Sequence, residues 1–282
     1  MASAKPGFDA GADTPFHRSG GGFLLFAVGR FAGVVALSWL ILFVLLHLLP
    51  NAGADVLAVQ FPADRLAVTL PLVLMAGILA LLLGAGISLL AARIGGAADR
   101  LLGGLATVLS HLPPFWLGLL LALMLAGMLP AGGFMPWSAG PSQALASLVL
   151  PALALGLPHA GEFAIRLRAA FGPEVEEAEI RALRIGGVTP ERARWSISWN
   201  RALPNLPQLA GRLLATVLVG AVVVENVFYL PGLGRQVLGA ALAHDLPALR
   251  ASLFLLVVIA AVLMLLGTLG RLAVEWKSGA LR

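Results

Sequence analysis

Cysteine is absent from this sequence of 282 residues, and charged residues are scarce. The absence of cysteine excludes disulfide frameworks, thiolate metal sites and cysteine nucleophiles. Charged side chains make up 12% of the residues and hydrophobic residues 59%, whereas a soluble domain usually carries roughly 25% charged residues. This composition predicts a protein whose surface faces lipid rather than water.

Common enzyme motifs are also missing. No G-x-x-x-x-G-K-[ST] occurs, so the chain cannot hold ATP phosphates in a P-loop. H-E-x-x-H and G-x-S-x-G are absent as well. His47, His111 and His159 fall in different apolar segments, where interior or interface roles are favoured and a shared metal site stays an alternative. We therefore expect no catalytic residue, no bound metal and no cofactor.

Six long apolar segments predict an all-α polytopic membrane protein with six transmembrane helices. They cover residues 23–49, 66–92, 101–129, 144–160, 209–230 and 251–270. The third segment contains Pro113 and Pro114, and a proline pair predicts a kink because it removes backbone donors and clashes with the preceding turn. Residues 1–22, which lack periodicity, and residues 271–282 are expected to form tails outside the bilayer.

The basic residues predict the orientation of these spans. Six spans place both termini on one side of the membrane, and sixteen of the nineteen Lys and Arg residues fall on that side. Only Arg65, Arg235 and Arg250 fall on the other side. Since basic residues concentrate on the cytoplasmic side, both termini are expected to be cytoplasmic. The net charge of +5 then reflects topology and does not indicate nucleic-acid binding.

One long polar segment, residues 171–207, lies between the fourth and fifth spans. It holds five of the fourteen acidic residues and five arginines. Its apolar residues recur at helical spacing around a Gly186-Gly187 pair that is expected to end a first helix. Thr189 and Pro190 then predict the start of a second helix that runs towards Ala202. Such a segment is either a solvated connector or a docking surface, and the two amphipathic helices favour docking.

Glu225 is the most unusual residue within the predicted spans. It lies about 9 Å along the helix axis from Pro231, near the predicted outer end. An acid at that depth is a candidate for function. A polar contact that joins two helices, or a cap for the outer loop, is an equal alternative. Glu162, at the inner end of the fourth span, is predicted to form an ion pair with Arg166.

The segment from Gly220 to Pro247 resembles the signature of B-type inner-membrane permeases of dipeptide, oligopeptide and nickel ABC importers. In that family a glutamate precedes a Phe-x-x-Pro-Gly-Leu-Gly turn, and an Asp-x-Pro follows. The matching residues here are Glu225, Phe228, Pro231, Gly232, Leu233, Gly234, Asp245 and Pro247. The resemblance implies that this set lies at a periplasmic gate or at a docking site for the binding protein. Segments 113–118 and 129–134 are similar to other parts of the same family.

Residues 171–207 resemble the EAA coupling loop of this family, whose short helix fits a cleft on the ATPase subunit. The residues matched to its ATPase contacts are Glu177, Ala178, Arg181, Ala182, Gly186, Gly187, Arg201 and Pro204. The resemblance implies a type I importer in the bacterial inner membrane. Its other parts would be a second, C-type permease, two cytoplasmic ABC ATPases and a periplasmic or lipid-anchored substrate-binding protein.

The resemblance implies a non-catalytic permease subunit that forms half of a pathway for dipeptides or oligopeptides. Nickel or a metal chelate is an alternative cargo. Only about fifteen residues separate the first two spans, where family members carry a longer external segment, so docking of the binding protein is expected on residues 231–250 or on the partner permease. A secondary transporter would place acids in several spans, and a scaffold subunit would not need proline-broken helices.

Overall fold

The computed structural model describes residues 22, 25, 28, 29, 31–37, 39, 40, 62–125, 127–171, 180, 181, 183 and 185–277. Within these residues the regular elements are all helical, which confirms the all-α fold class. Most of the first predicted span, residues 23–49, lies outside this part of the chain, although residues 31–37 within it are helical. Most of the predicted tail 1–22 and residues 278–282 also lie outside it.

Four described helices are long and apolar enough to cross a membrane. Three of them are α2 (Ala63–Ile94), α5 (Pro141–Ala170) and α10 (Leu246–Lys277), and the fourth is α8 (Leu206–Val227) together with the end of the helix before it. Helix α5 extends ten residues beyond the predicted end at residue 160. The reason is that residues 161–170 are less apolar but still rich in alanine and arginine, which favour helix.

The third predicted span is divided at its proline pair. Helix α3 (Gly96–His111) and helix α4 (Pro114–Leu125) meet at an angle of 96°. Leu112 between them is extended (φ −74°, ψ 122°), the conformation that a following proline imposes. The bend is therefore much sharper than a kink within one helix. The described part of the chain has five candidate spans if this pair counts as one, and the six-span count stays a prediction.

Helices α2, α5 and α8 form the centre of the bundle, and glycines bring them close together. A methyl group on Gly156 of α5 would lie 2.9 Å from the Ala76 carbonyl oxygen of α2. A methyl group on Gly211 of α8 would likewise lie 2.9 Å from the Cα atom of Gly267 in α10. Close approach through small residues is how membrane helices gain dispersion energy, since lipid offers no hydrophobic driving force.

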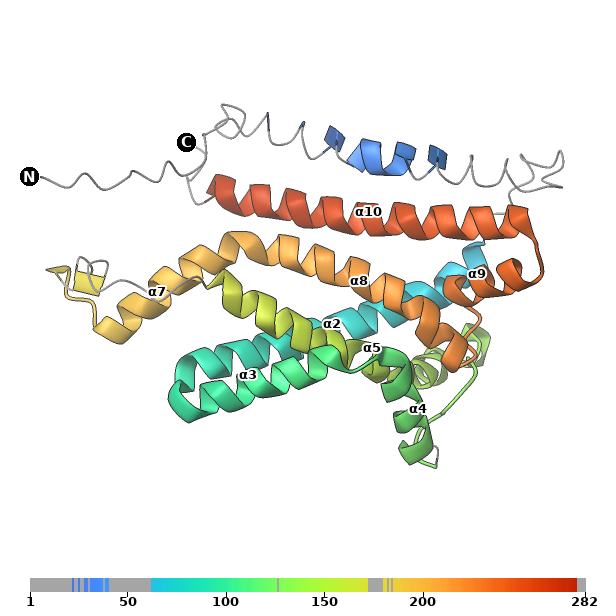
Figure 1. Cartoon of the computed structure of the whole chain (residues 1–282), viewed down its shortest axis with the longest axis horizontal. Coiled ribbons are helices and arrows are strands. Elements are labelled where there is room, and N and C mark those ends of the chain that lie inside the picture. The colour runs from blue at the N-terminus through green and yellow to red at the C-terminus, as the bar shows by residue number, and fades with distance from the viewer. Residues whose placement is uncertain are drawn as a thin grey trace, which may run out of the picture.

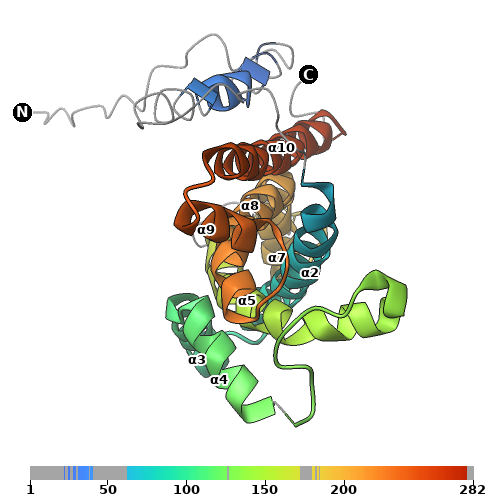
Figure 2. The same cartoon turned by 90° about the vertical axis from the view of Figure 1, so that its right-hand side faces the viewer.

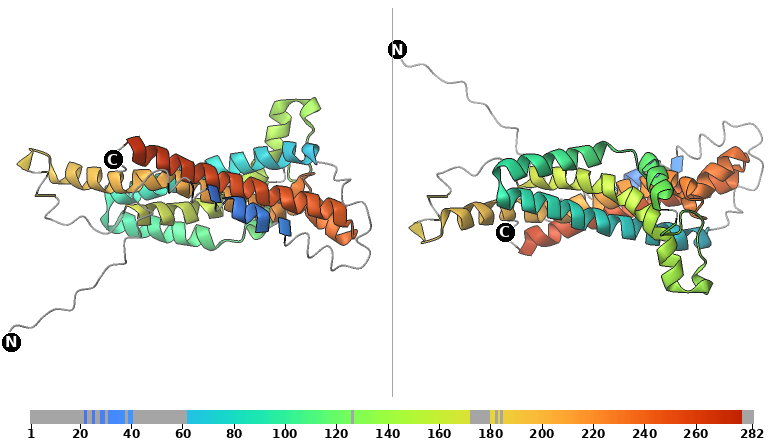
Figure 3. Two further views of the ribbon diagram at one scale, coloured as in Figure 1. Left: turned by 90° about the horizontal axis from the view of Figure 1, so that it is seen from above. Right: turned by 90° about the horizontal axis from the view of Figure 1, so that it is seen from below.

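The bundle is elongated, and its two ends carry different short elements (Figures 1 and 3). Helix α7 (Pro190–Ala202) and the 3₁₀ helix η3 (Leu203–Asn205) lead into α8 at one end. Helix α9 (Leu233–Leu242) and the 3₁₀ helix η2 (Trp137–Ala139) lie near the other. Seen along the bundle, α10 covers α8 on one side, and α3 and α4 lie on the opposite side (Figure 2).

A proline inside α2 provides an attachment point for η2. Pro71 has no N–H, so the Ala67 carbonyl four residues earlier lacks its usual helical donor. The indole N–H of Trp137 donates to this carbonyl at 3.0 Å. Phe134 packs edge-on against Trp137, with ring centroids 5.8 Å apart. The loop before α5 therefore supplies a hydrogen bond that α2 cannot make for itself.

Candidate functional site

Glu225 is completely buried near the end of α8, with 0% of its surface exposed. Each of its carboxylate oxygens accepts a hydrogen bond. The Thr69 hydroxyl of α2 donates to Oε1 at 2.6 Å, and the Arg235 backbone N–H of α9 donates to Oε2 at 3.1 Å. An acid in an apolar bundle is tolerated only when it is satisfied in this way. The carboxylate thus joins three helices.

Thr69 is the centre of this arrangement, and it is also buried, with 1% exposed. Its hydroxyl donates to Glu225 and accepts the Leu233 backbone N–H at 2.9 Å. Together, Glu225, Thr69, Leu233 and Arg235 are called the Glu225 cluster below. Thr69 was not among the predicted site residues, because one threonine in a long apolar segment carries no signal of its partner 156 residues away.

The Pro-Gly-Leu-Gly turn wraps around the Glu225 carboxylate. A methyl group on Gly232 would overlap this carboxylate, and one on Gly234 would overlap the Val222 backbone. Before the turn, Tyr229 has a φ of 55°, and the Leu230 N–H donates to the Glu225 carbonyl at 2.9 Å, which ends α8. Both glycines of the turn are therefore required by close packing.

Phe228 fastens the same turn to neighbouring elements. Its side chain is 1% exposed, and its ring lies so close to Gly118 of α4 that a methyl group there would be 2.9 Å from it. The Phe228 carbonyl accepts the Gly133 N–H at 2.8 Å. On the exposed side of the turn, the Arg235 guanidinium lies 4.9 Å from the ring centroid of the exposed Tyr229. The residues predicted from 225 to 234 therefore come together as one unit.

Asp245 and Pro247, matched to the same signature, have a different place. Asp245 is exposed, and its Oδ1 accepts the Ala248 N–H at 3.1 Å. This is the bond of a helix N-cap, and Pro247 follows in the first turn of α10, where a proline is tolerated. The Asp-x-Pro motif thus begins α10, and α9, an element that the sequence analysis left without a helix, separates it from the turn.

At the other end of the bundle, the described part of residues 171–207 includes a helix that ends at the Gly186-Gly187 turn. Residues 180, 181, 183 and 185 are helical, whereas the predicted contact residues Glu177, Ala178 and Ala182 lie outside the described residues. Gly187 has a φ of 80°, and the Val188 N–H bonds the Leu183 carbonyl at 3.4 Å. This is the left-handed glycine ending that the Gly186-Gly187 pair predicts. Arg181 and Gly186 are exposed.

Helix α7 begins where the sequence predicts. Thr189 takes the N-cap position in extended conformation and Pro190 follows as the first helical residue, although the Thr189 side chain forms no capping hydrogen bond. Arg201 lies in the last turn of α7, and its carbonyl accepts the Asn205 side-chain amide at 3.2 Å. Pro204 lies in η3, which joins α7 to α8.

An aromatic cluster attaches α7 to the bundle. Phe171, at the end of α5, lies 6.2 Å from Trp195 and 6.4 Å from Trp199 between ring centroids. The two tryptophans stack at 6.2 Å. The Arg93 guanidinium, at the end of α2, lies 5.3 Å from the Trp195 centroid, within cation–π range. The ends of α2 and α5 thereby hold the start of the next span.

Among the described residues, no group of three or more His, Asp or Glu side chains could hold a metal ion. His111 and His159 instead bond carbonyls of their own helices through Nδ1, each at 2.7 Å, to Thr107 and Leu155 respectively.

Comparison with known proteins matches residues 84–277 to the family described as binding-protein-dependent transport system inner membrane component. A putative peptide transport system permease protein of Brucella abortus (strain 2308) is 32% identical over 147 residues, which are 51% of this chain and 47% of the relative.

Two further relatives differ in the cargo that their names give. The probable D,D-dipeptide transport system permease protein DdpB of Escherichia coli K12 is 34% identical over 164 residues, covering 48% of this chain and 47% of the relative. The metal-staphylopine import system permease protein CntB of Staphylococcus aureus (strain NCTC 8325) is 27% identical over 172 residues, covering 60% and 52%. The chain spans about half the length of the curated relatives it matches.

Proposed function

Because the chain belongs to the family of binding-protein-dependent transport system inner membrane components, we propose that it is one of two permease subunits of an ATP-driven importer. It forms half of the translocation pathway in a bacterial inner membrane and carries out no chemical step. The first predicted span, residues 23–49, completes six spans with both termini in the cytoplasm. A C-type permease, two ATPases and a substrate-binding protein complete the importer.

The feature that carries this proposal is the polar segment between α5 and α8. It lies at one end of the bundle, and α7 extends beyond the long helices there (Figure 1). Leu183 and Ile185 are 36% and 90% exposed next to the exposed Arg181. Apolar side chains that a polar segment leaves open support a protein docking surface. We assign this surface to the cytoplasmic ATPases.

Coupling requires that the ATPases bind this surface differently in their open and closed states, since a partner shifts an equilibrium only by its differential affinity. The Phe171, Trp195 and Trp199 cluster supports such coupling because it attaches α7 to α5 and, through Arg93, to α2. Movement of residues 171–207, the proposed coupling segment, would then be transmitted to the long helices through packed side chains.

The Glu225 cluster, at the other end, would form the outward side of the pathway or the base on which the binding protein docks. Its carboxylate is enclosed by hydrogen bonds from its own chain. This enclosure supports a structural role for Glu225 and gives little support to a secondary transporter, which needs an acid that can bind and release an ion along its pathway.

The proposed cargo is a dipeptide or oligopeptide. The names of two relatives, a peptide permease and a D,D-dipeptide permease, support this cargo. The name of a third, a metal-staphylopine permease, supports the alternative of nickel or another metal carried in a small organic chelate.

Purification of the tagged chain in mild detergent tests the proposal. We expect two ATPase subunits and a second permease to be recovered with it, and ATP hydrolysis by the complex to rise when loaded binding protein is added. A chain that transports as a lone oligomer would instead support a secondary transporter, and a chain recovered with partners that lack ATPase activity would contradict the importer.

A further inference from the structure

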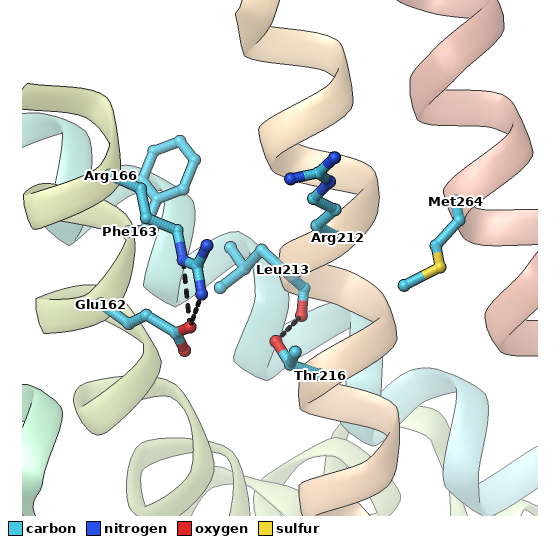
Figure 4. Close-up of a pocket in the computed structure, with 7 residues that line it drawn as sticks. All are labelled: Glu162, Phe163, Arg166, Arg212, Leu213, Thr216 and Met264. Atoms are coloured by element: carbon cyan, nitrogen blue, oxygen red, sulfur yellow. Dashed lines mark hydrogen bonds and ion pairs between the residues drawn. The ribbon is translucent and has the colours of Figure 1, made fainter. Parts of the chain in front are cut away.

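A cavity opens between α5, α8 and α10, near the end of the bundle that carries α7 (Figure 4). Its free volume is about 140 Å³. The residues that line it are Glu162, Phe163, Arg166, Arg212, Leu213, Thr216 and Met264. Whole small-molecule sites measure roughly 300–1,000 Å³, so this cavity has room for one end of a ligand only. The cavity thus combines an apolar wall with charged groups from two helices.

The charges that line the cavity do not cancel. Arg166 donates to Glu162 Oε1 through Nη2 at 2.6 Å and through Nε at 3.1 Å, which confirms the predicted ion pair. Arg212, on α8, forms no hydrogen bond or ion pair with any residue in the described part of the chain, and its guanidinium stands across the cavity from that pair (Figure 4). Within the part of the chain that the structure describes, one positive charge of the cavity is therefore left without a counterion.

The position of Arg212 makes this charge significant. Arg212 lies within the apolar segment Trp195–Val227, about 9 Å along the axis from the first residue of α8. Charged residues within a span normally face a wet cavity or a partner group rather than lipid. The exposed Arg212 side chain presents a planar fork of donors that matches a carboxylate with two parallel hydrogen bonds.

We propose that this cavity is a subsite for the carboxylate of the transported solute, with Arg212 as its binding residue. Phe163, Leu213 and Met264 would contact the apolar part of the solute. Glu162 and Arg166 on the opposite wall neutralise each other, so a singly charged carboxylate such as a peptide C-terminus balances the remaining charge of Arg212. The subsite rests on the proposed function in that the solute reaches the cavity along the pathway.

Chemical modification tests binding without requiring transport. The assembled importer, free of nucleotide, is placed in phosphatidylcholine nanodiscs and treated with phenylglyoxal, and mass spectrometry follows the modification of each arginine. Alanyl-alanine should slow modification of Arg212 by about threefold or more, whereas alanyl-alanine amide, which lacks the carboxylate, should not. Arg100, an exposed residue of α3, is the internal control and should react equally in all samples.

Three outcomes would overturn the subsite. Equal modification of Arg212 with and without the dipeptide would show that no carboxylate binds there. Arg212 that never reacts would show that a partner subunit covers the cavity. Protection by phosphatidylglycerol in the nanodisc, but not by the dipeptide, would assign the cavity to a lipid headgroup, which also suits a basic pocket between membrane helices.

Transport by the reconstituted importer separates the subsite from the proposed function. Arg212→Gln should reduce alanyl-alanine uptake about tenfold or more, because a charge-assisted hydrogen bond is lost. Arg212→Lys should retain part of the uptake, and Arg100→Gln should match the wild type. If the wild type protects Arg212 but imports no dipeptide, the proposed cargo fails and the subsite stands. If Arg212→Gln imports as well as the wild type, the subsite fails and the importer stands.

Discussion

At the scale of single residues, Thr69 explains how the chain tolerates a buried acid. Its hydroxyl is used twice, once as donor to Glu225 and once as acceptor from the Leu233 N–H. A buried donor or acceptor left without its partner costs about 1–3 kcal/mol. Loss of the Thr69 hydroxyl is therefore expected to destabilise the fold more than the small size of this side chain suggests.

Thr69→Val should lower the stability of the chain, because valine keeps the shape and removes both hydrogen bonds. We expect a loss of about 1–3 kcal/mol, measured as a lower apparent melting temperature of the purified chain in detergent. Thr69→Ser keeps the hydroxyl and should stay near the wild type. If the valine and serine variants melt together, the hydroxyl is not what supports Glu225.

Gly232→Ala should be more harmful than its single added methyl group suggests, because that group would overlap the Glu225 carboxylate. The expected loss is about 1–3 kcal/mol in apparent stability, typical of overpacking in a close-packed interior. Gly239→Ala, in the neighbouring α9, is the matched control, since a methyl group there meets nothing within 4 Å. Equal melting temperatures for both variants would contradict the packing described around the turn.

The sequence predicted the members of the turn but not what holds them. Glu225 was recognisable as an acid in an apolar span, and the two glycines were identified through the resemblance to the permease signature. Thr69 was not recognisable, since its role depends on a contact 156 residues away along the chain. Asp245 was grouped with the turn by its motif, whereas the structure uses it to cap α10.

At the scale of elements, long helices were the easiest to predict and their interruptions the hardest. Apolar runs identify α2, α5, α8 and α10, because a segment in lipid must satisfy its backbone hydrogen bonds internally. The proline pair predicted a kink but not the 96° bend between α3 and α4, which depends on where each half finds packing. Helix α9 was missed because it is short, ten residues long.

Gly187 permits the turn between the two helices of residues 171–207, the proposed coupling segment. Its φ of 80° lies in the left-handed region, where an L side chain costs about 1–2 kcal/mol. Gly187→Val should therefore leave membrane insertion intact and abolish the rise in ATP hydrolysis caused by loaded binding protein, because the exposed surface before α7 would be misplaced. The measurement is the ATPase rate of the purified importer with and without binding protein.

Gly104→Val, in α3, provides the control for this variant. Gly104 is exposed and does not have a positive φ, and a methyl group there would meet nothing within 4 Å. Its stimulated ATP hydrolysis should equal that of the wild type. Normal stimulation in Gly187→Val would count against residues 171–207 as the coupling segment.

At the scale of the whole molecule, the proposed orientation can be tested directly because the chain has no cysteine. Single cysteines at Ser138, in η2, and Ser196, in α7, would each replace an exposed side chain on elements that precede and follow α5. In spheroplasts, a membrane-impermeant maleimide should label Ser138→Cys at once. Ser196→Cys should be labelled only after the membrane is permeabilised, since basic residues favour a cytoplasmic location for that end.

The cysteine-free parent is the blank for this labelling, and it should take up no maleimide. Immediate labelling of Ser196→Cys with protection of Ser138→Cys would invert the topology and remove the ATPases from the segment assigned to them. Labelling of both variants in intact spheroplasts would contradict α5 as a spanning helix.

Helix α2 has one consequence for how the two ends of the protein communicate. Thr69 and Arg93 lie on this single helix, 24 positions and thus about 36 Å apart. Pro71 removes one helical hydrogen bond from α2, and the Trp137 indole supplies a donor in its place. We therefore expect a displacement of the Trp195 ring to be transmitted along α2 towards the Glu225 carboxylate.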